Sequence, residues 1–128
     1  MRYLLDTHTF LWWVTDDRRL SPRARALIRD PENEVLFSAA SAWEIAIEAQ
    51  LGRIVLRGDP REVIPRQVAA NGFAQLAIET PHALEVAALP LLHPDPFDRL
   101  LVAQALLEEL PLLSVDPAVA QYNVLVIW

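Results

Sequence analysis

Residues 3–14 read Tyr-Leu-Leu-Asp-Thr-His-Thr-Phe-Leu-Trp-Trp-Val, a short apolar run that passes directly into a helical pattern. Tyr3–Leu5 is predicted to be a buried strand and Thr7–Val14 a short helix. Because short apolar runs and helical patterns keep alternating along the chain, this stretch predicts a parallel α/β sheet. Asp6 falls just beyond the carboxyl end of the strand, where parallel α/β proteins bind their ligands.

The rest of the chain repeats this alternation. Ser21-Pro22 is typical of a helix start, with serine as the N-cap and proline in the first helical position. Gly52 and Gly72 mark helix ends, and Pro65 is expected to kink or break the helix that contains it. The predicted strands are Tyr3–Leu5, Val35–Phe37, Gln75–Ile78, Leu112–Leu113 and Val124–Ile127, and the predicted helices are Thr7–Val14, Pro22–Arg29, Ala39–Leu51, Pro60–Asn71, Thr80–Ala88 and Pro96–Glu109.

The composition narrows the chemistry. With 128 residues, 53% of them hydrophobic and 22% charged, the chain is expected to form a single domain with a packed core over residues 1–128. It contains no cysteine, which excludes thiol catalysis, disulfides and zinc–thiolate sites. All 11 basic residues are arginine, which excludes a lysine-containing phosphate loop and Schiff-base enzymes. No apolar run is long enough to span a bilayer and no signal cleavage site is present, so we expect a cytoplasmic protein without membrane contact.

Four acidic residues stand out by position: Asp6, Glu44, Asp98 and Asp116. Each has a structural explanation as a helix cap or a first-turn acid. That explanation is weaker for Glu44 and Asp98, because both lie in apolar helices and burying an unpaired carboxylate is expensive. A metal ion would remove this cost. Since only oxygen ligands are offered, Mg²⁺ or Mn²⁺ fits better than zinc, and such a centre supports phosphodiester hydrolysis.

The net charge is −6, which by itself argues against a nucleic-acid enzyme, because non-specific binding to phosphates requires basic side chains. The objection weakens if several of the acids hold divalent cations. Such cations would cancel much of the excess charge and would themselves attract phosphate.

Four ordered segments closely resemble the PIN-domain ribonuclease toxins of the VapC type: Leu4–His8, Ser38–Ile47, His93–Ala105 and Leu113–Asp116. The resemblance spans essentially the whole chain. It implies a three-layer α/β/α fold, a single PIN domain with a central parallel sheet of four to five strands. It also implies a Mg²⁺-dependent endoribonuclease, the toxin of a type II toxin–antitoxin pair, which forms homodimers and binds a cognate antitoxin. It assigns Asp6, Glu44, Asp98 and Asp116 to the catalytic, metal-binding pocket.

Four further residues are expected to support this pocket. Thr7 would support Asp6 by hydrogen bonding, and the hydroxyl of Ser114 would bind a water or a carboxylate. His93 would orient the substrate or a neighbouring acid, with loop packing as the alternative. Asp95 is interpreted as the N-cap of the long helix rather than as a ligand.

Other polar and aromatic residues have less specific expectations. His82 is expected at the surface, and Arg99 either contacts phosphate or pairs with an acid. Trp12, Trp13 and Trp43 are interpreted as core residues, with stacking on the bases of single-stranded RNA as the alternative. Because adjacent helical residues point about 100° apart, some apolar side chains of the first two helices are expected to stay exposed and form an interface.

Two other functions remain open from the sequence. The chain could be a non-catalytic PIN-like module that binds RNA or a protein partner, although none of the four acids is missing. It could also be a metal-dependent DNase or phosphatase, because a metal–carboxylate centre attacks the phosphodiesters of RNA and DNA alike.

Overall fold

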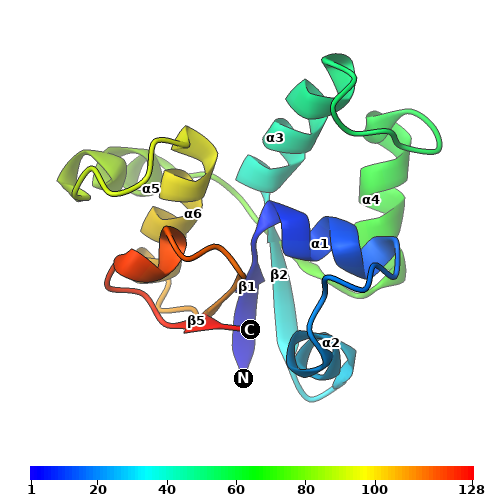
Figure 1. Cartoon of the computed structure of the whole chain (residues 1–128), viewed down its shortest axis with the longest axis horizontal. Coiled ribbons are helices and arrows are strands. Elements are labelled where there is room, and N and C mark those ends of the chain that lie inside the picture. Colours follow the sequence, from blue (N-terminus) through cyan, green and yellow to red (C-terminus); the bar gives the residue numbers. More distant parts are fainter.

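Five parallel strands form one sheet in the order β3-β2-β1-β4-β5, with helices on both faces (Figure 1). The computed structural model describes the whole chain, Met1 to Trp128. The strands are β1 (Arg2–Leu5), β2 (Glu34–Ser38), β3 (Ala74–Leu76), β4 (Leu112–Leu113) and β5 (Val126–Ile127); the helices are α1 (Thr7–Val14), α2 (Pro22–Arg29), α3 (Ala39–Gln50), α4 (Pro60–Ala70), α5 (Thr80–Glu85) and α6 (Pro96–Leu107), with 3₁₀ turns at Val86–Ala88 and Val119–Gln121.

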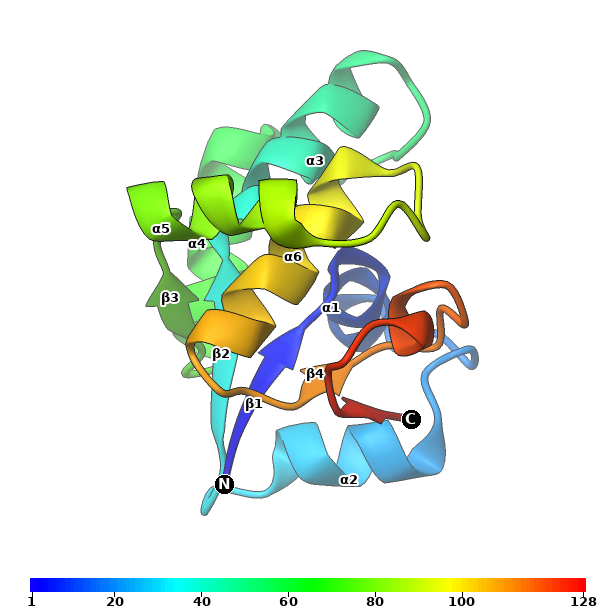
Figure 2. The ribbon, with the colours of Figure 1, turned by 90° about the vertical axis from the view of Figure 1, so that its left-hand side faces the viewer.

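Two apolar cores lie on opposite faces of the sheet, because successive side chains of a strand point to opposite sides. In β1, Tyr3 and Leu5 belong to one core and Leu4 to the other. In β2, Phe37 and Leu36 divide in the same way. Helices α1 to α4 contribute to the first core, while α6 supplies more buried residues to the second than any other element does. Figure 2 looks onto the face that α5 and α6 cover. The three-layer α/β/α architecture predicted from the sequence is confirmed.

The strand order reverses direction at β1. This strand pairs with β2 on one side and with β4 on the other, so the chain winds outward in both directions. Leu5 lies opposite Leu113 in the register, and the Asp6 N–H donates to the Leu113 carbonyl at 3.2 Å. The residues after β1 and β4 therefore leave the same edge of the sheet side by side. This is the switch point at which doubly wound α/β folds bind ligands.

All predicted strands and helices are present, and most bounds agree within two residues. The helix predicted over Thr80–Ala88 ends at Glu85 and tightens into a 3₁₀ turn. Of the kink or break predicted at Pro65, the break was wrong, since α4 continues through this residue. Proline removes only the hydrogen bond to the Arg61 carbonyl, and both residues are exposed, so water can solvate the freed carbonyl. No helix is long and apolar enough to cross a membrane.

The two prolines of α4 allow a matched stability test. Pro65→Ala should raise the unfolding free energy by about 1–3 kcal/mol, because the new N–H restores the missing hydrogen bond. Pro60→Ala is the control: Pro60 is in the first turn, where no intrahelical partner is lost, and the change should stay within about 0.5 kcal/mol. Urea denaturation of both variants measures this, and equal effects would contradict it.

Candidate active site

An acidic pocket opens beyond the carboxyl ends of β1 and β4, with a volume of about 370 Å³. Three of the four predicted acids line it, each delivered by a different element. Asp6 follows β1, Asp98 lies in the first turn of α6, and Asp116 follows β4. The complete lining consists of Asp6, His8, Trp12, Arg19, Asp98, Val115, Asp116 and Pro117.

Asp6 is both a cap and a pocket residue. Its Oδ1 accepts the Thr9 N–H at 2.8 Å, which caps α1, and its side chain is buried. Burial raises the pKa of Asp6 above its ordinary value, and hydrogen bonds from Ser114 and Thr9 oppose that rise. The cap and the site explanations are therefore compatible, because one carboxylate oxygen satisfies the helix while the group still faces the pocket.

Asp98 is free to face the pocket because its neighbour Asp95 caps α6. The Asp95 Oδ1 accepts from the Phe97 N–H at 2.8 Å and from the Asp98 N–H at 3.3 Å, so the predicted N-cap is confirmed. Burial, followed by the nearby charges of Asp95, Glu44 and Asp6, raises the pKa of Asp98 to about 7. Loss of a proton from Asp98 is therefore unfavourable unless a cation is close.

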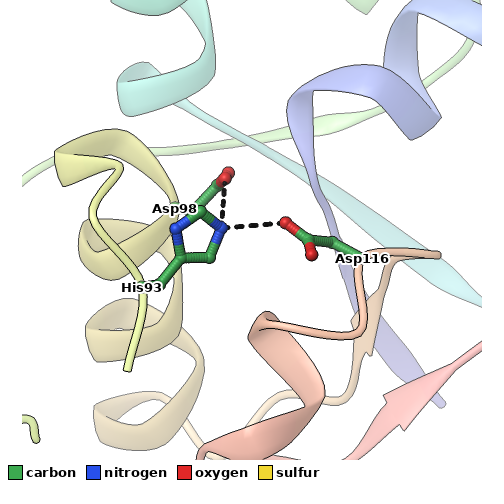
Figure 3. A group of neighbouring side chains, drawn as sticks. All are labelled: His93, Asp98 and Asp116. Carbon is green, nitrogen blue, oxygen red and sulfur yellow. Dashed lines mark hydrogen bonds and ion pairs between the residues drawn. The ribbon is translucent and has the colours of Figure 1, made fainter. Parts of the chain in front are cut away.

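His93 joins two of the carboxylates (Figure 3). Its Nε2 lies 3.0 Å from the Asp98 Oδ2 and 2.8 Å from the Asp116 Oδ2. Its Nδ1 accepts the backbone N–H of Asp95 at 3.1 Å, which assigns the ring proton to Nε2 in the neutral ring. The imidazole therefore faces both acids as a hydrogen-bond donor. The sequence-based expectation that His93 orients a neighbouring acid agrees with this geometry.

Ser114 links the two strand-end acids. Its hydroxyl accepts the Asp116 N–H at 3.1 Å, and its hydrogen bond to Asp6 lowers the pKa of that carboxyl. The Asp116 Oδ1 in turn accepts the Ala118 N–H at 2.9 Å, which fixes the carboxylate at the start of the following turn. Ser114 is itself buried, so its position is set by the sheet.

Glu44 lies behind the pocket on α3. It is 9% exposed, and its Oε1 is the one buried side-chain oxygen or nitrogen in the chain without a hydrogen-bond partner. Burial raises the pKa of Glu44, the hydroxyl of Thr7 opposes this, and the Asp95 charge adds to it. Glu44 does not form a capping box with Ser41, because α3 begins earlier and is capped by Ser38, whose hydroxyl oxygen accepts the Ala40 N–H.

Thr7 supports a different partner from the one predicted. Its hydroxyl donates to Ser41 at 2.9 Å, and no hydrogen bond joins it to Asp6. Thr7 begins α1 and Ser41 lies in the first turn of α3, so this bond ties together the two helices that present Asp6 and Glu44.

The donor set fits a hard divalent cation. The pocket presents three carboxylates, and behind them lies the unpartnered Glu44 Oε1, whose burial would be repaid by a nearby positive charge. His93, Asp98 and Asp116 offer ligand-type atoms within 4.8 Å of one another. Because the Nε2 of His93 bears the proton, the available donors are carboxylate oxygens, which suit Mg²⁺ or Mn²⁺.

Three expectations for residues outside the pocket were wrong. His82 is buried, with Nε2 2.9 Å from the Glu108 Oε1 and Nδ1 accepting the Glu79 N–H. Arg99 is buried and contacts no acid; its guanidinium donates to backbone carbonyls, including that of Pro90 at 2.9 Å. Trp43 was expected in the core, but its side chain is 57% exposed.

The sequence interpretation also missed one wall of the pocket. His8, Trp12 and Arg19 line it together with the acids. His8 and Trp12 are four residues apart on α1, a spacing that places both on one face of a helix, and Asp6 directly precedes that helix. This spacing could have placed both beside Asp6. No sequence signal placed Arg19 there, because its position depends on how the loop after α1 folds back.

The strand order and the acidic pocket define the chain as a doubly wound α/β protein with an acidic pocket at its switch point. The PIN domain family matches residues 3–125. The chain therefore belongs to the PIN domain family.

Individual relatives agree with this assignment. Ribonuclease VapC16 of Mycobacterium tuberculosis is 36% identical over 58 residues, which span 45% of this chain and 41% of that protein, less than half its length. A chain of VapBC2 from Rickettsia felis, crystallised with a DNA fragment from its promoter, superposes with a TM-score of 0.72 at 12% identity, covering 100% of this chain and 99% of that one. A toxin–antitoxin complex from Klebsiella pneumoniae gives a TM-score of 0.65 at 18% identity, with 98% and 96% coverage.

The raised pKa of Asp98 predicts the direction of a pH effect on the metal-free protein. The folded state binds this proton more tightly than the unfolded chain, whose ordinary pKa is 3.8. The stabilising contribution is therefore fully present below about pH 4 and is lost as the pH rises through about 7. In EDTA, the unfolding free energy of the wild type relative to Asp98→Asn should fall across this window, because the amide stays neutral.

Urea denaturation of both proteins at several pH values measures this difference. At about pH 7, Mg²⁺ should restore the unfolding free energy of the wild type, and it should change that of Asp98→Asn much less. Curves that stay parallel at every pH would show that Asp98 is not held in its protonated form by the pocket.

Proposed function

We propose that this chain is a metal-dependent endoribonuclease, the VapC-type toxin of a type II toxin–antitoxin pair. The observation that carries the proposal is the convergence of Asp6, Asp98 and Asp116 on one pocket at the switch point, with the buried, unpartnered Glu44 behind them. Membership of the PIN domain family and the match to Ribonuclease VapC16 support RNA as the substrate. The fold shared with toxin–antitoxin complexes supports the toxin role.

Asp6, Asp98 and Asp116 would hold the Mg²⁺ or Mn²⁺, with Glu44 adding negative charge behind them. Such an ion supplies positive charge beside the scissile phosphodiester and makes an attacking water more acidic. Oxygen donors favour these ions over zinc.

The surrounding residues keep the carboxylates in place. The Nε2–H of His93 is shared by Asp98 and Asp116, which limits how far these two acids separate. Ser114 positions Asp6 and Asp116 from the end of β4, and Asp95 leaves Asp98 free by capping α6. Thr7 links the helices that present Asp6 and Glu44 through Ser41. These four residues are proposed as positioning residues, because none of them is needed as a ligand.

Cleavage of a labelled single-stranded RNA in the presence of Mg²⁺ tests the proposal. EDTA should stop cleavage, and Mg²⁺ or Mn²⁺ should restore it. Asp6→Asn and Asp98→Asn should reduce cleavage to the level of a buffer control, because an amide is a poor ligand for the cation. Asp95→Ala is the matched control: it should cost about 1 kcal/mol of stability as a lost cap while keeping much of the activity.

The same assay separates the alternative functions. DNA of the same sequence should be cut far less than RNA; equal cleavage would indicate a DNase. RNA that binds but is never cut, with every metal, would indicate a non-catalytic module. Hydrolysis of a simple phosphomonoester without cleavage of RNA would indicate a phosphatase. Sequencing the 5′ ends of cellular RNA after expression of the wild type and of Asp6→Asn would locate the cleavage site.

Two protein partners belong to the proposal, a second copy of the chain and a cognate antitoxin. The interface predicted on the first two helices is not a broad exposed patch, because Phe10, Leu20 and Ile28 are buried there. An exposed apolar surface lies elsewhere, at Trp43, which is 57% exposed and borders a pocket lined by Ala83, Val86 and Leu100. The homodimer is proposed to use this surface, since large exposed apolar side chains usually mark an interface. The antitoxin is proposed to place an arginine in the acidic pocket, against Asp6 or Asp98.

The Trp43 surface predicts an effect on self-association. The Trp43 ring meets the Phe97 ring edge-on at 5.0 Å and borders an apolar pocket of about 200 Å³. Trp43→Ala should shift the chain from dimer towards monomer in sedimentation experiments while its circular dichroism spectrum stays that of the folded chain, because the ring is largely exposed. Leu125→Ala is the control and should leave the dimer intact, because Leu125 is an exposed apolar residue just before β5, beside the C-terminal end of α6. An unchanged dimer in the Trp43 variant would place the interface elsewhere.

A further inference from the structure

The acidic pocket has one cationic wall. Arg19 is the one arginine among the lining residues, and it faces a pocket that otherwise presents Asp6, Asp98 and Asp116. Its guanidinium carbon lies 4.9 Å from the centre of the Trp12 ring, a cation–π contact. The chain has a net charge of −6, so to act on a polyanion it needs a positive group close to its acids. Arg19 supplies such a group.

The loop that carries Arg19 is tightly built. Asp16 reverses the chain after α1 with a positive φ of 53°, a conformation that aspartate tolerates. The Asp17 N–H then donates to the Trp12 carbonyl at 2.8 Å, which folds the loop back against α1. Leu20 is 2% exposed and anchors the next position in the core. From α2, the guanidinium of Arg25 holds the loop through Asp16 and through the Asp17 carbonyl.

Asp17 orients the guanidinium of Arg19. Its carboxylate accepts Nε at 3.0 Å, Nη2 at 2.8 Å and the Arg19 backbone N–H at 2.9 Å. Nη1 donates to no group of the chain, and the Arg19 side chain is 68% exposed. A guanidinium has five N–H donors, so the pairing with Asp17 leaves donors available on the open side. Nε and Nη2 of Arg19 are thus bonded to Asp17, and Nη1 is available to donate to a ligand.

We infer that Arg19 binds a phosphate of single-stranded RNA next to the one being cleaved, and that the stacked Arg19–Trp12 pair presents a planar surface to the adjoining base. The inference rests on the proposed function and adds a substrate subsite to it. A phosphate accepts from a guanidinium edge, and bases stack on guanidinium and aromatic planes. The alternative is that Arg19 has only a structural role, holding its loop together through the ion pair with Asp17.

Binding of a fluorescent single-stranded RNA tests this inference. All proteins carry Asp98→Asn, so that RNA is bound without being cut, and affinity is measured in Mg²⁺ over a range of salt concentrations. Arg19→Gln should weaken binding by about tenfold at low salt, the loss of one charged hydrogen-bonded contact. It should also reduce the slope of log K against log salt by about 0.7, the value for one phosphate contact on a single strand.

Three control variants distinguish a phosphate contact of Arg19 from a purely structural role in its loop. Arg18 is an equally charged, exposed neighbour outside the pocket, so Arg18→Gln should change affinity by less than about twofold. Asp17→Asn removes the ion pair with Arg19 but keeps the guanidinium, so it should preserve the slope of log K against log salt. Arg19→Lys keeps the charge and should also preserve the slope, with a lower affinity because the planar fork is lost.

The outcomes distinguish this subsite from the proposed function. If Arg19→Gln behaves like Arg18→Gln, the subsite is refuted while the ribonuclease proposal stands. If Asp17→Asn and Arg19→Gln lose the same affinity and the same slope, Arg19 has only a structural role and the inference is wrong. If the Asp98→Asn parent binds no RNA and the wild type does not cut RNA in Mg²⁺, the proposed function fails and the subsite fails with it. Circular dichroism of each variant confirms that the fold is retained.

Discussion

The pairing of β1 with two neighbours is the constraint on which the site depends. Because β2 and β4 both add to β1 in parallel, the chain must leave β1 and β4 at the same edge and continue to opposite sides of the sheet. Asp6 and Asp116 are placed together by this topology, without any attraction between them. Helix α6, packed on one face, then brings Asp98 to the same edge from outside the sheet. A change in strand order would separate these acids even if every residue were kept.

Like charges gathered in this way destabilise the fold, and the chain offsets them with hydrogen-bond donors. The positive ends of two helices lie at the acids, since Asp6 caps α1 and Asp98 lies in the first turn of α6. Hydroxyl, imidazole and backbone N–H groups supply the remaining contacts. These donors are insufficient in the absence of a cation, as the raised pKa values of Asp6, Glu44 and Asp98 indicate. The site is thus a place where the fold gives up stability for binding.

Most of the fold could be predicted because its strands and helices are determined by patterns within short stretches of sequence. Strands alternate between two cores, and caps such as Ser21 and Asp95 fix helix starts, so short windows of sequence identify them. The acids were predicted from their positions relative to those elements. The errors at His82 and Arg99 have one cause, since each is a polar side chain that is held in part by groups 9 to 26 residues away in the sequence. Arg19 was missed because a loop, and not a periodic element, brings it to the pocket.

Asp95 shows how one residue connects folding to chemistry. Its carboxylate caps α6, while its backbone N–H donates to the Nδ1 of His93. The second bond keeps the ring proton on Nε2, so His93 stabilises the negative charge of Asp98 and Asp116 and does not compete with them as a nitrogen ligand. Were Nδ1 to carry the proton instead, two donors would face each other at Asp95 and Nε2 would be free to ligate a softer metal ion. The proposed preference for hard cations therefore depends on the loop that starts α6 as much as on the acids themselves.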